Sequence, residues 1–362
     1  MNVCLIGYNL TNFIIALELI KKGFVVDIIY ENINKKTKTN RTIGISKNNF
    51  DFLNLNLKNI YNYSWPITKI KIYNQRNNSK EFLDFSNENK INFFLIKYDD
   101  LFNLLEKKCK KFKKIKFKLT KKKEIENLEI KNVYDFIINS DSKNILTKRH
   151  FNKTIKKDYN SSAFTGILNH YKIKNNTAAQ IFTRYGPLAF LPLSQTKTSI
   201  VYSVEKKYHL EKIDIKNLVL EFNKIYRIKK INKLEKFDLN FSFSRNIFYK
   251  NILCFGDLMH KIHPLAGQGF NMTLRDIKIF SSLIQERLDL GLPLDSFILK
   301  QFEEKTKSKN YIFSTGIDFI YEFFKLENKY GNKYSNQILS AVGKNNTFSK
   351  YVSKIADNGL FF

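Results

Sequence analysis

Residues 252–276 read ILCFGDLMHKIHPLAGQGFNMTLRD and join several features of a ligand-binding segment in one piece. An apolar run opens the stretch and predicts a buried strand, which ends at Gly256 and Asp257. A loop with two histidines and a proline follows, and Gly267 and Gly269 then lead into apolar residues at helical spacing. Glycine lets backbone N–H groups approach a ligand closely, and the start of a helix attracts negative charge. The stretch therefore predicts a strand, loop and helix that cradle an anion or a ring that becomes anionic.

The N-terminal segment predicts a second part of the same site. An apolar strand, a turn, apolar residues at helical spacing and a second apolar strand follow one another. This order is the dinucleotide-binding arrangement, in which an acid after the second strand holds a ribose hydroxyl. Glu31 stands at that position. The turn keeps Gly7 of the G-x-G-x-x-G pattern, whereas Asn9 and Asn12 replace the two later glycines.

The two asparagines weaken this fingerprint. Asparagine tolerates a left-handed backbone better than most residues, but its side chain would crowd a pyrophosphate and the contact between helix and strand. We therefore expect Asn9→Gly and Asn12→Gly to tighten nucleotide binding. The alternative is a unit of this shape that no longer binds a nucleotide.

The motif G-D-x-x-H-x-x-x-P-x-x-G-Q-G-x-N within residues 252–276 resembles the second flavin-binding motif of the class A flavin-dependent aromatic hydroxylases. Its form HPLAGQG, with Arg275 and Asp276 downstream, is most similar to that of the hydroxylases of ubiquinone biosynthesis. The run GPLAFLPL at 186–193 also resembles the substrate-domain sheet of those enzymes. The resemblance implies an α/β fold, with a Rossmann-like FAD-binding domain, a β-sheet substrate domain and a helical C-terminal tail.

The same resemblance implies a chain that passes between its domains more than once. The FAD-binding domain would be discontinuous and comprise residues 1–64, 91–160 and 250–290; the substrate-binding sheet would take 65–90 and 161–249, and the helical region 291–362. The two flavin motifs then belong to one domain, although most of the chain separates them.

The resemblance assigns cofactor-binding residues to turns and strand ends. Arg41 lies in a segment, NRTIGIS, that resembles the family segment whose arginine contacts the flavin cofactor. Asp141 keeps the acid of an A-D-G-x-x-S motif that is only half present. Asp257 would hydrogen-bond the ribityl chain. The full set for FAD is Gly7, Asn9, Asn12, Glu31, Arg41, Asp141, Gly256, Asp257, Gly267, Gln268, Gly269 and Asn271.

The resemblance places four residues around the reacting ring. Pro264 would line the reaction site, and the backbone of Gly267 and Gln268 would stabilise negative charge on the reduced ring. His263 is the ionisable side chain nearest to this place in the sequence. The sequence leaves open whether His263 takes part in catalysis or packs, and the same holds for the motif histidine His260.

The activity implied is an FAD-dependent monooxygenase that hydroxylates the ring of a prenylated phenol in ubiquinone biosynthesis, using NAD(P)H and O₂ via a flavin hydroperoxide. The run 186–193 is apolar and contains no arginine that would pair with a substrate carboxylate; Arg184 lies just outside it. A polyprenyl tail is too long to enclose, so we expect peripheral membrane association, at the inner face of the membrane on the cytoplasmic side. Association with other quinone-biosynthesis proteins is expected too. The altered glycines motivate an alternative, a non-catalytic scaffold with the same fold in that assembly.

Composition limits the other classes of function. The formal net charge of +29 suits an anionic partner, either nucleic acid or a membrane surface, whose binding would weaken with salt. The lysines are dispersed and no nucleic-acid motif accompanies them, so we expect solvated faces and no nucleic-acid partner. The three cysteines show no disulfide or metal spacing, so we expect no metal and a reducing cytoplasm. No apolar run long enough for a spanning helix occurs, and the N-terminus predicts no secretory signal.

Overall fold

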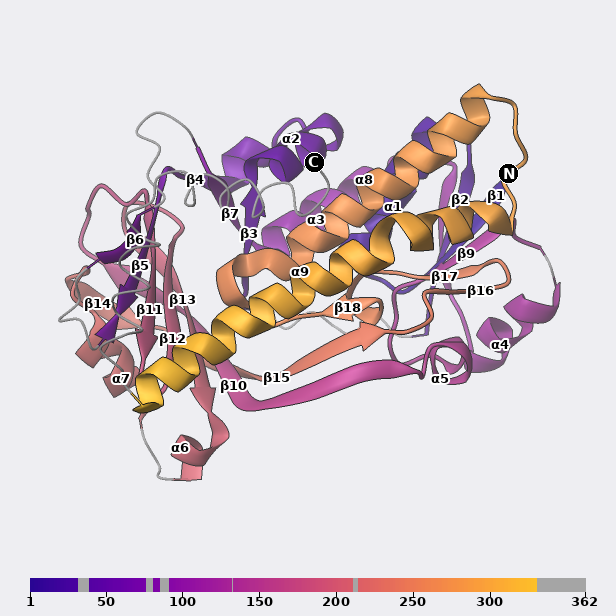
Figure 1. The fold of residues 1–362 in the computed structure, drawn as a ribbon. Coiled ribbons are helices and arrows are strands. Elements are labelled where there is room, and N and C mark those ends of the chain that lie inside the picture. The colour runs from indigo at the N-terminus through magenta and orange to yellow at the C-terminus, as the bar shows by residue number, and fades with distance from the viewer. Residues whose placement is uncertain (32–38, 76–80, 85–90, 132, 211–213, 331–362) are drawn as a thin grey trace.

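The computed structural model describes residues 1–31, 39–75, 81–84, 91–131, 133–210 and 214–330. Two sheets lie at opposite ends of this structure, and the long helices α8 (Gln268–Asp289) and α9 (Ser296–Tyr330) run alongside one another across it (Figure 1). The α/β fold class expected from the sequence is confirmed.

One sheet contains the predicted dinucleotide-binding arrangement. Its strands lie in the order β16-β17-β9-β1-β2-β8, and only the edge strand β16 runs antiparallel to its neighbour. Read from β8 to β17 the parallel strands have the chain order 3-2-1-4-5, which is that of a doubly wound nucleotide-binding sheet. The strands are β1 (Asn2–Ile6), β2 (Val25–Tyr30), β8 (Ile115–Leu119), β9 (Phe136–Asn139), β16 (Phe248–Tyr249) and β17 (Ile252–Cys254).

Helix α1 (Leu10–Lys21) connects β1 to β2 and is covered on most sides. It packs against both strands, against α3 (Tyr98–Cys109) and against α8. A helix that is apolar nearly all round needs such cover, and this cover fixes its first turn at the end of β1. The shorter helices of this part of the chain are α2 (Lys47–Asn56), α4 (Lys122–Lys131) and α5 (Ile145–His150).

A three-stranded antiparallel sheet carries the segment that follows Arg41. Its order is β3-β7-β4, and the backbone N–H of Tyr98 donates to the carbonyl of Arg41 at 2.9 Å. The strand β4 pairs with β7 and not with the large sheet, so the chain leaves this region only after Ile67, two residues beyond the boundary expected at 65. The elements are β3 (Thr42–Ser46), the 3₁₀ turn η1 (Ile60–Tyr63), β4 (Ser64–Ile67) and β7 (Phe93–Lys97).

The second large sheet has the order β18-β15-β10-β13-β12-β11-β5-β6, with β14 also paired to β10. Strand β10 spans both sides of the boundary expected at 160: its register with β15 shifts between Asp158 and Ser161, and Asn160 has a positive φ of 49°. Such a bulge bends a strand. The strands are β5 (Lys69–Asn74), β6 (Glu81–Asp84), β10 (Thr154–His170), β11 (Thr177–Thr183), β12 (Gly186–Pro192), β13 (Lys197–Glu205), β14 (Ile228–Ile231), β15 (Glu235–Ser244) and β18 (His260–Lys261).

The predicted apolar wall 186–193 is divided between the two faces of this sheet, because side chains alternate along a strand. Leu188 and Phe190 are fully buried in a cluster with α7 (Ile215–Phe222). Ala189 and Leu191 lie on the opposite face. Ala189 and Leu191 of the expected wall therefore remain available to a ligand, on the face away from α7.

The C-terminal helical tail is confirmed for the residues that the structure describes. The pattern at 297–324 predicts one helix or a pair, and α9 is a single helix that contacts both β11 and β16, so it spans the two sheets (Figure 1). Helix α7, which the Asp214 side chain caps, follows α6 (Lys206–Leu210) in the chain. The described helices include none that is long and apolar enough to cross a membrane.

Candidate functional site

Parallel strands end together at one edge of the nucleotide-binding sheet, and the predicted residues follow them directly. The crevice between β1 and β9, where the strand order reverses, is the usual ligand site of such a sheet. The residues that the chain places just beyond the carboxyl ends of β1, β2, β9 and β17 are Gly7, Glu31, Ser140, Asp141, Gly256 and Asp257. Residues far apart in sequence are thereby brought to one place.

The turn after β1 is filled by its own side chains. Asn9 caps α1, because its Oδ1 accepts from the backbone N–H of Asn12 at 3.1 Å, and its Nδ2 donates to Ser140 Oγ at 2.8 Å. The side chain of Asn12 is fully buried and donates to the carbonyl of Gly7 at 2.8 Å. Gly7 has φ +117°, and a Cβ there would lie 3.0 Å from Asn9 Nδ2. Glycine is required at that position, and the asparagines occupy the space beyond it.

Glu31, just after β2, has a carboxylate oxygen that accepts no hydrogen bond from the described residues. This oxygen, Oε1, is buried. A buried carboxylate oxygen without a donor is unfavourable, and a ribose hydroxyl is the donor that this position receives in nucleotide-binding folds. The contact of Glu31 with a ribose stays a prediction.

The second motif packs against the first. Gly256, in the 3₁₀ turn η3 (Gly256–Leu258), has φ +63°, and a Cβ there would lie 3.0 Å from Thr11 Oγ1 in the first turn of α1. Any larger residue would push these two segments apart. The glycine therefore fixes Asp257, which is exposed, beside the start of α1.

Arg41 packs on Tyr98, and the charge of Asp257 also acts on that ring. The Arg41 guanidinium lies over the Tyr98 ring, 5.3 Å from its centroid. Burial raises the pKa of Tyr98, the charge of Arg41 lowers it and the charge of Asp257 raises it. The Tyr98 ring thus packs under a cation, Arg41, and lies within the electrostatic influence of the exposed acid Asp257.

The glycine turn before α8 lies against β3. Gly267, in η4 (Leu265–Gly267), has φ +65° and precedes α8 without a side-chain cap; a Cβ there would lie 3.6–3.7 Å from the backbone of Gly44. Asn271 holds this contact, since its Nδ2 donates to Gly44 O at 2.8 Å and to Gly267 O at 3.0 Å. Its Oδ1 accepts from the N–H of Ser46 at 2.9 Å and from the amide of Asn49 at 3.0 Å. These bonds saturate the amide, so Asn271 positions the two segments and has no donor or acceptor left for a cofactor.

Gln268 is the second buried group that lacks partners. Its side chain is 2% exposed, and neither its Oε1 nor its Nε2 has a hydrogen-bond partner among the described residues. It is the first residue of α8, whose N-terminal N–H groups are also uncapped. Unmade hydrogen bonds of this kind are expected where a ligand completes them. By contrast, a Cβ at Gly269 would make only an ordinary contact with Ile262, at 3.7 Å.

His263 and Pro264 point to different roles. Pro264 is exposed, as a residue that lines a reaction site must be. His263 is buried; its ring stacks on Tyr321 at 4.2 Å and meets the edge of Tyr159 at 5.1 Å. Burial, aided by the charge of Lys157, lowers the pKa of His263 to about 3. So low a pKa makes a poor base at neutral pH, and the geometry favours packing over proton transfer.

Asp141, the acid predicted after β9, accepts a hydrogen bond within its own turn. Asp141 Oδ1 accepts from the N–H of Lys143 at 2.8 Å, and its carbonyl accepts from Thr147 Oγ1. The residue that the sequence analysis missed is Ser140, which bonds Asn9. Its only signal in the sequence is its place directly after a strand that pairs with β1.

The face of the large sheet that carries Ala189 is partly open, and at Phe182 it is covered by Phe324 of α9. Ile72, Gln180, Ala189 and Val201 lie in adjacent register across four strands, and all except Ala189 are only partly buried. Phe182, on the same face of β11, belongs to one cluster with Ile262 and Leu265, the apolar residues around Pro264. This face therefore lies next to the loop that carries Pro264 and offers an apolar surface with one amide.

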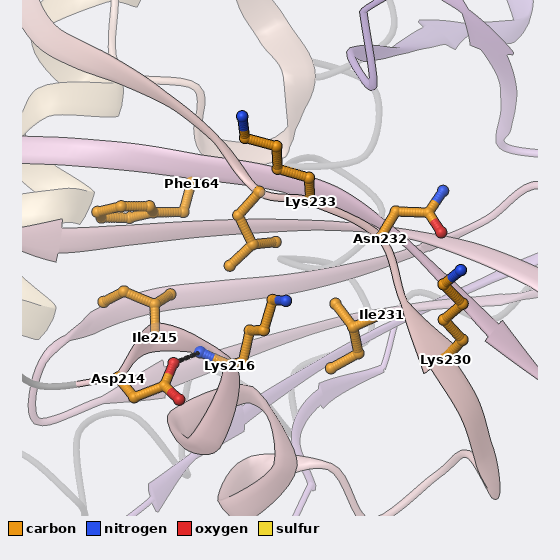
Figure 2. Close-up of a pocket in the computed structure, with 9 residues that line it drawn as sticks. Phe164, Asp214, Ile215, Lys216, Lys230, Ile231, Asn232 and Lys233 are labelled. Atoms are coloured by element: carbon orange, nitrogen blue, oxygen red, sulfur yellow. Dashed lines mark hydrogen bonds between the residues drawn. The ribbon is translucent and has the colours of Figure 1, made fainter.

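A separate pocket lies on the opposite side of the large sheet, between α7 and β14 (Figure 2). Its volume is about 760 Å³, and Lys216, Lys230 and Lys233 surround an apolar part that includes Ile215 and Ile231. None of the predicted site residues lines it. The structure thus contains a second hollow with a basic rim, distinct from the crevice of the parallel sheet.

The described residues contain no cluster of His, Cys, Asp and Glu that suits a metal ion. Cys4, Cys109 and Cys254 are buried and unpaired, and burial raises the pKa of each thiol. Buried thiols of high pKa are unreactive.

The chain is similar to several curated proteins, although no family model matches it. A stretch of 152 residues is 30% identical to the 3-demethoxyubiquinol 3-hydroxylase of Escherichia coli strain K12 and covers 40% of this chain and 39% of that protein. A stretch of 95 residues is 33% identical to the ubiquinone biosynthesis monooxygenase COQ6 of Dictyostelium discoideum, covering 26% of this chain and 19% of the relative. The chain therefore spans less than half the length of these relatives.

Solved structures match nearly the whole chain. The p-nitrophenol 4-monooxygenase PnpA from Pseudomonas putida DLL-E4 superposes with a TM-score of 0.75 at 10% identity, over 99% of this chain and 98% of the other. PqsL of Pseudomonas aeruginosa, a probable FAD-dependent monooxygenase, gives 0.71 at 12% identity, over 94% and 98%. The fold is that of the FAD-dependent monooxygenases. The flavin-dependent brominase Bmp2 shares it, with a TM-score of 0.74 at 11% identity over 100% and 95%. The monooxygenase fold therefore does not define the substrate by itself.

The residues present fit an FAD in two of three places. Within the described part of the chain, Glu31 Oε1 and the amide of Gln268 have no partner; the first suits a ribose, and the second, at the start of α8, suits a polar ring. At the pyrophosphate position, between Gly7 and α1, the Asn9 side chain already bonds the backbone. A bound dinucleotide has to compete with that bond.

Proposed function

We propose that this chain is an FAD-dependent monooxygenase that hydroxylates the aromatic ring of a prenylated phenol in ubiquinone biosynthesis, with NAD(P)H as reductant. One observation carries the proposal. Gly256, which opens the second motif, packs against Thr11 in the first turn of α1, after Gly7, at the carboxyl ends of the parallel strands where the strand order reverses. The sequence relatives named above supply the reaction class and the pathway.

Bound FAD supplies the redox chemistry, and the chain holds and shields it. Glu31 binds the ribose through its free carboxylate oxygen, and Asp257 binds the ribityl chain. The start of α8, with Gln268, would stabilise negative charge on the bound ring. Pro264 covers the reacting edge and helps to exclude water.

The substrate side argues for a prenylated phenol. The open face with Ile72, Ala189, Leu191 and Val201 is apolar, so it would gain free energy from covering a hydrocarbon chain. No basic side chain lies in that row of the described sheet, so a carboxylate substrate would lack a charged partner there. Gln180, in the same row, carries an amide that suits a phenolic oxygen.

Membrane association is part of the proposal. Ile312, Phe319 and Leu326 recur every seven residues on α9, so they share one face, and all are exposed, Phe319 at 69%. Together with Ile320 they form an apolar stripe. A net charge of +29 adds attraction to an anionic leaflet, at about 1 kcal/mol for each lysine near the surface.

The first experiment asks whether the purified protein carries FAD. We expect a yellow protein whose flavin is released by denaturation, because no cysteine or histidine stands in a recognised flavin-linking context. O₂ and NAD(P)H consumption is then measured with a prenylated phenol in detergent and with a soluble hydroxybenzoate. Coupled turnover is expected with the prenylated phenol.

A matched pair of variants tests the substrate face. Leu191→Glu places a charge on the open face and should abolish turnover while FAD stays bound. Leu220→Glu places the same charge on exposed α7, on the other side of the sheet, and should change neither. A colourless protein that takes up no FAD would leave only a scaffold of this fold, whereas coupled turnover of the hydroxybenzoate alone would refute the substrate assignment.

A further inference from the structure

Asn9 is held at both ends of its carboxamide. The Oδ1 atom accepts from the backbone N–H of Asn12, and the Nδ2 atom donates to Ser140 Oγ. Ser140 in turn donates from Oγ to the carbonyl of Ile6 at 3.2 Å, and its own N–H donates to the same carbonyl at 3.1 Å. The side chain of Asn9 therefore joins the start of α1 to the ends of both β1 and β9.

This arrangement occupies a donor that nucleotide-binding turns leave open. The first N–H groups of a helix have no partner within the helix, and with glycine at the cap position they are free to bind phosphate. Here the N–H of Asn12 is satisfied by Asn9 Oδ1 at 3.1 Å. The oxygen of the carboxamide thus stands where a phosphate oxygen would accept.

We propose that Asn9 is an internal substitute for the dinucleotide phosphate, which caps α1 in the FAD-free protein and leaves the N–H of Asn12 when FAD binds. This inference rests on the proposed function, since it concerns the affinity and exchange of FAD at that site. Two consequences follow. The FAD-free protein keeps a capped, ordered α1 and stays folded, and FAD binds less tightly than it would to a glycine turn and exchanges with free FAD.

The test compares three variants by FAD titration of the FAD-free protein and by its thermal melting. Asn9→Gly removes the competing oxygen and should bind FAD roughly three- to tenfold more tightly, the equivalent of one released hydrogen bond. Its melting temperature should fall only slightly, because glycine is itself an acceptable cap. Ser140→Ala loosens the Asn9 side chain without altering the turn and should tighten FAD by a smaller factor.

Asn9→Asp separates capping from phosphate binding. An aspartate keeps the acceptor and caps a helix at least as well, so the FAD-free protein should melt no lower than wild type. Its negative charge repels the pyrophosphate, so FAD affinity should fall by roughly tenfold or more. The matched control is Asp214→Gly, which removes the cap of α7, where Oδ1 accepts from the N–H of Lys216 at 2.9 Å. It should lower melting only slightly, as Asn9→Gly does, and leave FAD affinity unchanged.

Each outcome decides between the two proposals. Tighter FAD in Asn9→Gly with weaker FAD in Asn9→Asp supports the substitute. Unchanged or weaker FAD in Asn9→Gly, while wild type binds FAD, overturns the inference and leaves the proposed function standing. FAD uptake by Asn9→Gly but not by wild type supports it in its strongest form. Absence of binding in every variant, each still folded by its melting curve, refutes the proposed function and this inference with it.

Discussion

The imidazole of His260 lies 2.6 Å from the carboxylate of Asp276, and both side chains are fully buried. Asn310 donates from Nδ2 to the second carboxylate oxygen at 2.8 Å. The three residues come from β18, α8 and α9, so one buried carboxylate ties the flavin-motif loop to both long helices. This answers the question that the sequence left open for His260, which packs and bonds within the protein.

We expect Asp276→Ala to lower the free energy of unfolding by about 3 kcal/mol, because it leaves His260 and Asn310 buried without their acceptor. Chemical denaturation measures the change. Asp51→Ala is the matched control, since it removes an exposed ion pair with Lys47 that is worth about 0.5 kcal/mol at most. Equal losses in the two variants would show that the buried network contributes nothing special.

The sequence predicts the elements of this site better than their connections. The local pattern of residues 252–276 predicts a strand, a loop and a helix. The structure contains all three as β17, η4 and α8. The bond from His260 to Asp276 follows from how α8 packs, which no local pattern records. Ser140 was missed for the same reason, since its role depends on β9 lying beside β1.

Face assignments also needed the structure. The run 186–193 is apolar throughout, as in a strand buried on both sides, so its composition does not tell which residues reach a ligand. The pairing of Ala189 with Gln180 and Val201, and the burial of Leu188 under α7, divide the run. Where apolar and polar residues do not alternate along a strand, the sequence does not predict which side chains lie on which face of the sheet.

The buried His263 should make stability depend on pH. Its pKa is lowered from 6.5 to about 3 by burial, so between those values the unfolded chain binds a proton that the folded chain does not. The free energy of unfolding should therefore fall as the pH drops below 6.5, by up to about 1.4 kcal/mol per unit down to about pH 3. His263→Phe, which can still stack on Tyr321, should flatten this dependence. An identical pH profile in the variant, followed by denaturation between pH 3 and 7, would contradict the burial of a neutral imidazole.

Asp257→Ala should weaken FAD binding and leave the fold intact. The residue is exposed and fixed by Gly256 beside α1, so its loss removes a contact to the ligand but none to the core. A charged hydrogen bond is worth about 1.5–3 kcal/mol, and the FAD dissociation constant should rise by roughly ten- to a hundredfold. Glu304→Ala, an exposed acid on α9, is the control. Unchanged FAD affinity in Asp257→Ala would place the ribityl contact elsewhere.

Asn12→Gly should destabilise the FAD-free protein, a cost that the sequence alone did not indicate. The structure gives the Asn12 side chain a bond to Gly7 O and full burial inside α1. Glycine there would lose that bond and add backbone entropy to the unfolded chain, for a combined loss of about 1–2 kcal/mol in the free energy of unfolding. The change should appear in denaturation curves of the FAD-free protein. A variant as stable as wild type that also binds FAD more tightly would restore the simpler steric view.

The apolar stripe on α9 should bind to membranes. Ile312→Ser with Phe319→Ser removes the two most exposed members of the stripe without touching the cluster beneath α9 that contains Phe313 and Tyr321. Binding to vesicles with anionic headgroups should fall by roughly tenfold or more, because each deleted side chain would otherwise bury apolar surface in the interface. Phe237→Ser, an exposed aromatic residue of β15, is the control and should bind as wild type does. Added salt should weaken binding of all three proteins, since the lysines attract the surface electrostatically. Loss of binding in the control to the same extent, or none in the α9 variant, would mean that charge alone brings the protein to a membrane and that α9 faces another partner.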